Sequence, residues 1–192
     1  MGRATLPQTC RQMQRSFSSA DLERLFAGCF AKDQNTVLVG GAEEPFYQPA
    51  TAGQPAKIIY TRDYFRSALH EIAHWCVAGP ARRKLADFGY WYAADGRDAR
   101  QQLEFQQVEI KPQALELLFC AASAHPFRVS LDNLQGEAGD ASGFEDAVWR
   151  RATWLLKSGV PGRAARWCRV LSNYYRDEPF SAGQIDEVFL RW

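Results

Sequence analysis

Two histidines four residues apart, with a glutamate directly after the first, are the most constraining feature of this sequence. The motif reads His70-Glu71-Ile72-Ala73-His74, and the preceding residues 63–69 are compatible with a helix. On a helix, side chains four residues apart lie on the same face, so both imidazoles can bind one metal ion. Imidazole suits zinc, iron, copper and nickel, so the pair predicts a metal site without naming its chemistry. A motif of this length also arises by chance, so its surroundings decide how it is interpreted.

The residues around the motif favour a functional metal site. The chain has 192 residues and only three histidines, and the motif contains two of them. The helix is expected to end at Gly79-Pro80, a typical C-terminal signal. Apolar neighbours would give the ligands a surrounding of low dielectric constant. These neighbours are Ile72, Ala73, Trp75 and Cys76.

Composition narrows the class of protein. A chain of this length, with 46% hydrophobic and 13% aromatic residues, favours one globular domain. Its formal net charge of +1 gives no general argument for a nucleic-acid partner, and we expect no direct nucleic-acid contact. Without a run of eighteen apolar residues, we expect no membrane span. The five cysteines form no Cys-x-x-Cys pair, and the first twenty residues do not resemble a secretory signal, so we expect a reduced, cytoplasmic protein.

The pattern along the chain predicts an α+β fold, a small mixed sheet packed by helices in a single domain. We expect a flexible N-terminal extension at residues 1–17 and a catalytic domain at 18–192. Ser18 is expected to cap a helix through Phe30. Strands are expected at 36–39, closed by Gly40-Gly41, at 57–60 and at 88–92, with a loop at 43–55. Further helices are expected from Pro112 to Ala122 and at 144–157, 162–175 and 182–191.

A third metal ligand is needed, and a carboxylate is favoured because His125, before Pro126, is expected to cap a helix or lie on the surface. The downstream candidates are Glu104, Glu109 and Glu116. Glu109 is preferred because it ends a segment, 105–110, that is expected to be extended. Glu116 is expected within the following helix, as a ligand, as a partner of a ligand, or on a solvated face.

Two histidines and one carboxylate fit two different chemistries. Tetrahedral zinc would keep one position open for water, with Glu71 as the general base of a metallopeptidase. A ferrous ion would keep up to three positions open, enough for dioxygen. The usual dioxygenase signature, His-x-Asp or His-x-Glu, is absent from this chain. From the residues alone, the metallopeptidase is favoured.

A longer set of motifs resembles the bacterial elongation factor P hydroxylase family. The resemblance covers most of the chain beyond the basic N-terminal residues, and its last helices match more loosely. The matching blocks are Asp21-Leu22, Leu25-Phe26, Cys29-Phe30, Glu44-Pro45, residues 68–76, 81–83, 87–92, 95–99, 108–109, 111–115, Pro126-Phe127, Val129-Ser130 and 132–134. Several coordinated blocks are more specific than the five-residue peptidase motif alone.

The resemblance implies a metal-dependent monooxygenase. Its substrate would be the lysine of elongation factor P to which another enzyme has attached a β-lysyl group. The metal ligands that the resemblance implies are His70, His74 and Glu109, with iron, Fe(2+), as the metal and molecular oxygen as co-substrate. Glu71 would then orient water or the substrate amine beside the metal. The chain carries no match to 2-oxoglutarate enzymes, and the resemblance does not name a reductant or an organic co-substrate.

Weaker signals concern substrate contacts. The aromatic run 88–92 is most often core, but with Asp87, Tyr90 and Asp98 it could hold a long cationic lysyl arm. From Trp149 to Arg176 there are seven Arg or Lys residues and no Asp or Glu. This stretch is either a solvated face or a docking surface for an acidic partner protein, and Arg163 and Arg166 are its docking candidates.

Overall fold

The computed structural model describes residues 16–89, 96–132 and 141–190. Three strands form one mixed sheet: β1 (Thr36–Ala42), β2 (Phe46–Gln48) and β3 (Ala56–Thr61). The strand order is β1-β3-β2, with β1 parallel and β2 antiparallel to β3. The α+β fold class is confirmed.

Local sequence explains β1 and β3 better than β2. Both strands expected from β-branched and aliphatic runs are confirmed. However, β1 continues through Gly40-Gly41 as a bulge, where Gly41 has a φ of 95°. At Gly40 a Cβ atom would lie 2.6 Å from the ring of Tyr60, so only glycine fits there. Strand β2 lies in the stretch that was expected to be a loop. It pairs with β3, although its own sequence gives no strong signal for a strand.

The N-terminal helix α1 (Ser19–Phe26) begins after Ser18 and continues as a π-helical segment, Ala27–Ala31, and the short α2 (Lys32–Gln34). Residues 1–15 of the expected extension lie outside the described residues. Phe17 does not belong to such an extension, because its ring packs against the rings of Phe65 and His125. The folded part therefore includes Phe17.

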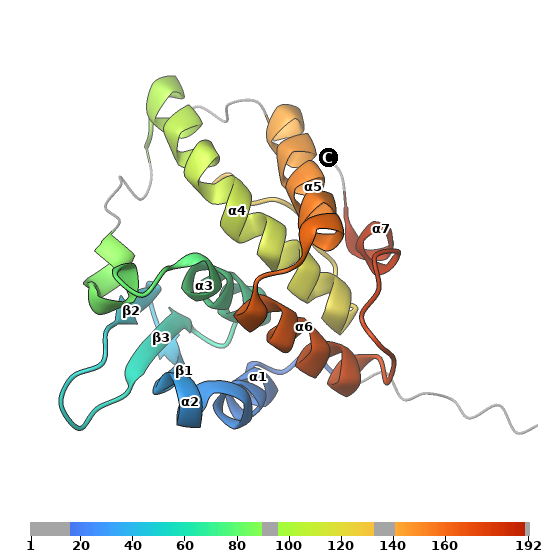
Figure 1. Cartoon of the computed structure of the whole chain (residues 1–192). Coiled ribbons are helices and arrows are strands. Elements are labelled where there is room, and N and C mark those ends of the chain that lie inside the picture. The colour runs from blue at the N-terminus through green and yellow to red at the C-terminus, as the bar shows by residue number, and fades with distance from the viewer. Residues whose placement is uncertain (1–15, 90–95, 133–140, 191–192) are drawn as a thin grey trace, which may run out of the picture.

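Helix α3 (Phe65–Val77) carries the two-histidine motif and lies between the sheet and the long helix α4 (Figure 1). It ends just before Gly79-Pro80, as predicted. After it come two 3-10 turns, Arg82–Lys84 and Ala86–Gly89. The strand expected at 88–92 is therefore wrong for Phe88 and Gly89, which have left-handed φ values of 57° and 70°. The rest of that strand lies outside the described residues.

Helix α4 (Ala99–Ser123) differs most from the sequence expectation. The segment 105–110 is helical rather than extended, and Pro112 lies inside the helix rather than at its start. Proline inside a helix removes one backbone hydrogen bond. Here burial outweighs that loss, because every residue from 112 to 123 is buried. A capping box between Asp98 and Gln101 fixes the N-terminus of the helix.

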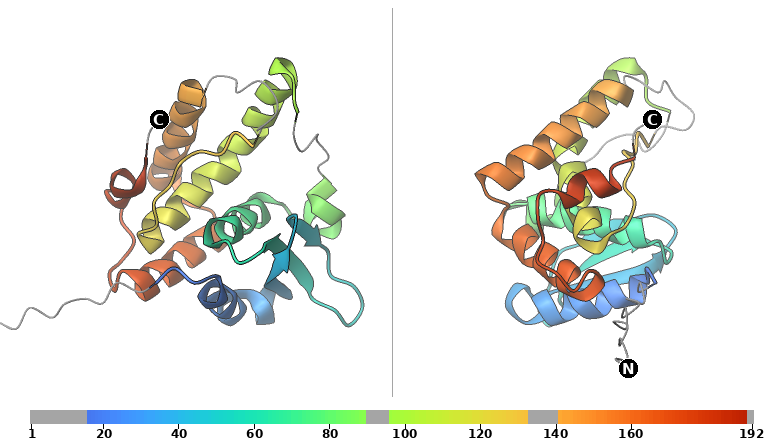
Figure 2. Two further views of the ribbon diagram at one scale, coloured as in Figure 1. Left: turned by 180° about the vertical axis from the view of Figure 1, so that it is seen from behind. Right: turned by 90° about the vertical axis from the view of Figure 1, so that its right-hand side faces the viewer.

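Three further helices pack against α4: α5 (Ala141–Ser158), α6 (Gly162–Tyr175) and α7 (Gln184–Val188) (Figure 2). The helices expected at 144–157 and 162–175 are confirmed, whereas α7 is shorter than the expected 182–191. Within the described ranges, no helix combines the length and the apolar character needed to cross a membrane.

Candidate metal centre

The facing surfaces of α3 and α4 build the centre. On α3, Arg66, His70 and His74 follow one another at intervals of four residues, so they share one helix face. On α4, Glu109 and Glu116 are seven residues apart, about two turns, and they also share a face. The two helices pack against each other with these faces together.

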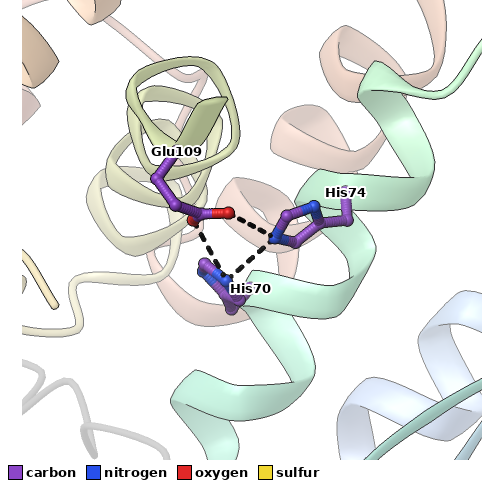
Figure 3. Close-up of side chains that lie close together, drawn as sticks. All are labelled: His70, His74 and Glu109. Carbon is purple, nitrogen blue, oxygen red and sulfur yellow. Dashed lines mark hydrogen bonds and ion pairs between the residues drawn. The ribbon is translucent and has the colours of Figure 1, made fainter. Parts of the chain in front are cut away.

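His70, His74 and Glu109 converge on one point (Figure 3). The Nε2 atoms of the two histidines are 3.0 Å apart. The carboxylate oxygens of Glu109 lie 3.5 Å from His70 Nε2 and 3.3 Å from His74 Nε2. Ligands bound at about 2.1 Å to one ion would be about 3.0 Å apart at right angles and about 3.4 Å apart at tetrahedral angles. The three separations therefore fit a shared metal ion.

The surroundings of Glu109 also fit a metal. Its side chain is only 1% exposed, and no hydrogen bond of normal geometry reaches either carboxylate oxygen, whose nearest polar neighbours are the two histidine Nε2 atoms. A buried carboxylate without donors is costly unless a cation compensates it. Burial opposes its ionisation, but the charges of His74 and His70 lower the pKa of Glu109 to about 2. An ionised carboxylate and two imidazoles form a donor set that suits iron or zinc.

Glu116 contacts the other side of the His70 ring. Its Oε2 lies 2.9 Å from Nδ1 of His70, and its Oε1 accepts hydrogen bonds from Nε and Nη2 of Arg66 at 2.9 and 2.7 Å. Burial raises the pKa of Glu116, but the charge of Arg66 and the contact with His70 outweigh it and hold this pKa below its usual value. Glu109 therefore faces Nε2 of His70, on the edge toward His74, and Glu116 faces Nδ1 on the other edge of the ring. Arg66 was not among the sequence candidates, although its spacing from His70 is the signal that could have found it.

A cavity of about 750 Å³ opens in front of the three converging side chains. Glu71 lines it, and burial raises the pKa of the Glu71 carboxyl. Asp87 also lines the cavity, and its Oδ1 accepts a hydrogen bond of 2.8 Å from the backbone N–H of Tyr47. Glu44 adds a further carboxylate to the lining. The cavity wall is thus rich in negative charge.

Among the described residues, the remaining substrate and docking candidates Asp98, Arg163 and Arg166 do not line this cavity. Tyr90 lies outside the described residues. The carboxylate of Asp98 caps α4 by accepting from the N–H of Gln101, and Asp98 does not line the cavity. The expectation that Asp98 contacts the substrate stays a prediction.

Both docking candidates have partners within the fold. Arg163 donates to the carbonyl oxygens of Cys76 and Ala78 at the end of α3, at 3.2 and 2.7 Å. Arg166 forms an ion pair of 2.7 Å with Asp33. These contacts give Arg163 a structural role within the fold, and its docking role also stays a prediction. The docking role of Arg166 stays a prediction.

Comparison with known proteins identifies the family. The family model described as elongation factor P hydroxylase matches residues 25–185. The chain belongs to the elongation factor P hydroxylase family. It is also 45% identical over 159 residues to the elongation factor P lysine hydroxylase of Haemophilus influenzae. That alignment covers 82% of this chain and 89% of the relative.

The family membership confirms the resemblance on which the hydroxylase prediction rests. The alternative drawn from the short motif alone, a zinc metallopeptidase, finds no support in these relatives. The metallopeptidase alternative rests on five residues, whereas the match to the family extends along most of the chain.

Proposed function

We propose that this protein is a metal-dependent monooxygenase that hydroxylates the lysine of elongation factor P after a β-lysyl group has been added to it. The proposal is supported by membership in the hydroxylase family. The observation that carries it is the convergence of His70, His74 and Glu109 in the wall of a cavity. Because this substrate serves translation, we propose that the reaction takes place in the cytoplasm.

The three converging side chains would hold a ferrous ion. When bound, that ion would supply the activation of molecular oxygen, because a face of three protein ligands leaves positions for dioxygen. The histidines would offer their Nε2 atoms, and Glu109 would offer a carboxylate oxygen from a side chain that is 1% exposed. Zinc has no redox chemistry of its own, so iron suits a hydroxylase better.

The cavity suits a long cationic side chain. Glu44, Glu71 and Asp87 give its wall negative charge, while Phe88 and Phe105 add aromatic surface for the aliphatic part of a lysyl arm. We assign Glu71 to orient the substrate amine or a water molecule beside the metal. It lines the same cavity as the two histidines and is not one of the three converging side chains.

The mass of elongation factor P tests this function. We expect the protein from cells that lack this enzyme to be lighter by one oxygen atom, and we expect the wild-type gene to restore that atom. His74→Ala should not restore it. His125→Gln is the matched control and should restore it, because His125 does not line the cavity. An unchanged mass in the deletion strain would refute the proposed function.

A further inference from the structure

Arg66 is a cation in the wall of the metal cavity, and its guanidinium is already committed to three contacts. Nε and Nη2 donate to Oε1 of Glu116 at 2.9 and 2.7 Å, and Nη2 also donates to the backbone carbonyl of Arg128 at 2.8 Å. The planar guanidinium holds the carboxylate and the carbonyl in a fixed relation, which the single charge of a lysine cannot do. Arg66 is therefore placed to hold Glu116 rather than to bind a ligand.

Glu116 divides its two oxygens between two partners. Oε1 accepts from Arg66, and Oε2 faces Nδ1 of His70 at 2.9 Å. When the proton of the His70 ring lies on Nδ1 and is donated to Oε2, the lone pair of Nε2 is directed at His74 and Glu109. A hydrogen bond to one ring nitrogen selects the tautomer and the orientation in which the other nitrogen binds a metal.

Burial makes this arrangement depend on Arg66. The Glu116 side chain is 1% exposed, while that of Arg66 is 34% exposed. A buried carboxylate that loses its cationic partner keeps the whole cost of its desolvation. Without Arg66, Glu116 would also lose the two donors that fix the rotation of its carboxylate. The ring of His70 would then lose the fixed partner that orients it.

From this geometry we propose that Arg66 and Glu116 are a positioning pair that fixes His70 for metal binding. This inference rests on the proposed metal-dependent function and deepens it. Arg66 acts through Glu116 and then through His70, so the three residues form one path. Such a path makes a specific prediction: removing either member of the pair should remove the same contribution to metal binding.

Equilibrium titration with Co²⁺, followed by its visible absorption spectrum, tests the path. Arg66→Met and Glu116→Gln should each weaken Co²⁺ binding by about tenfold to a hundredfold, which is typical when the partner of a metal-bound histidine is lost. The two changes should also alter the Co²⁺ spectrum in the same way. The double variant should bind Co²⁺ about as weakly as whichever single variant has the lower affinity. Because it removes both charges together, it also leaves neither charge buried without its partner.

Arg100→Met and Glu104→Gln are the matched controls. These residues form an Arg–Glu pair on the exposed surface of α4, so both variants should bind Co²⁺ like the wild type. Wild-type affinity in Arg66→Met, or losses that multiply in the double variant, would overturn the positioning pair. Failure of the wild type to bind Co²⁺ at all would instead count against the proposed metal-dependent function.

Discussion

At the scale of single residues, Glu109 determines the character of the centre. Two imidazoles without a carboxylate would bind a metal ion weakly. A carboxylate exposed to solvent would be hydrated, and water would compete with the metal ion for it. Glu109 is buried, and its nearest polar neighbours are the two histidine Nε2 atoms, so a cation bound between these three side chains would compensate its charge. Its position opposite both Nε2 atoms makes that cation a shared one.

The ligand assignment predicts equal consequences for three substitutions. His70→Ala, His74→Ala and Glu109→Ala should each abolish retention of Fe(2+) and enzyme activity, because two remaining ligands hold a labile ion poorly. Metal content of the purified proteins, measured by elemental mass spectrometry, checks this. Glu104→Ala, on the exposed surface of α4, should keep its metal. Full metal content in Glu109→Ala, together with loss in Glu116→Ala, would show that the wrong carboxylate was assigned.

Glu71→Gln should separate metal binding from catalysis. The amide has the shape of the carboxylate but no charge, and Glu71 is not one of the three converging side chains. We expect wild-type metal content and an activity reduced by about tenfold to a hundredfold, the usual effect of removing a group beside a metal site. Metal content and turnover should be measured on the same preparation. A parallel loss of metal would place Glu71 among the ligands.

At the scale of elements, α4 shows where sequence-based prediction succeeds and where it fails. Helix α3 was predicted because the sequence signals for it are local. They are the histidine spacing and the glycine and proline that follow the helix. In α4 the local signals mislead, since Pro112 is a typical helix start and the residues before it alternate weakly. Burial along the second half of α4 keeps the helix continuous, and burial is a tertiary effect.

The error about α4 also hid the relation between its two glutamates. Glu109 was expected at the end of an extended segment, and family resemblance, rather than helix geometry, assigned it to the metal. On a continuous helix the seven-residue spacing places Glu109 and Glu116 on one face, so both can reach His70 from opposite sides of its ring. The role of Arg66 could be inferred only after the structure had shown Glu116 beside His70.

The contacts of Arg163 predict a structural role at the end of α3. Arg163→Ala removes two charge-assisted hydrogen bonds to the last carbonyls of this helix and the packing of the guanidinium over the Trp75 ring. We expect a loss of about 1.5–3 kcal/mol in the free energy of unfolding, measured by urea denaturation. Arg169→Ala, at an exposed position of the same helix α6, should change stability little. An unchanged urea midpoint in Arg163→Ala would free this residue for a docking role.

At the scale of the whole molecule, the centre lies where the two parts of the fold meet. Helix α3 packs on strand β3 of the sheet, while α4 packs against α5, α6 and α7. The α+β class was predictable from aliphatic runs and helix signals. The meeting of α3 and α4 was not, because no local pattern states which helix faces lie together. A metal bound by both helices would join the two parts.

This position predicts that metal stabilises the entire domain. An ion that binds only the folded state adds RT ln(1 + [M]/Kd), about 2.7 kcal/mol at a hundredfold excess over Kd. Chelator-treated protein should therefore unfold at a lower temperature, and added Fe(2+), in the absence of oxygen, should restore the original Tm. His74→Ala should unfold at one Tm with or without metal, since it lacks a ligand, whereas His125→Gln should respond like the wild type. If neither chelator nor added metal changes the Tm of the wild type, the three converging side chains do not hold an ion in the folded protein.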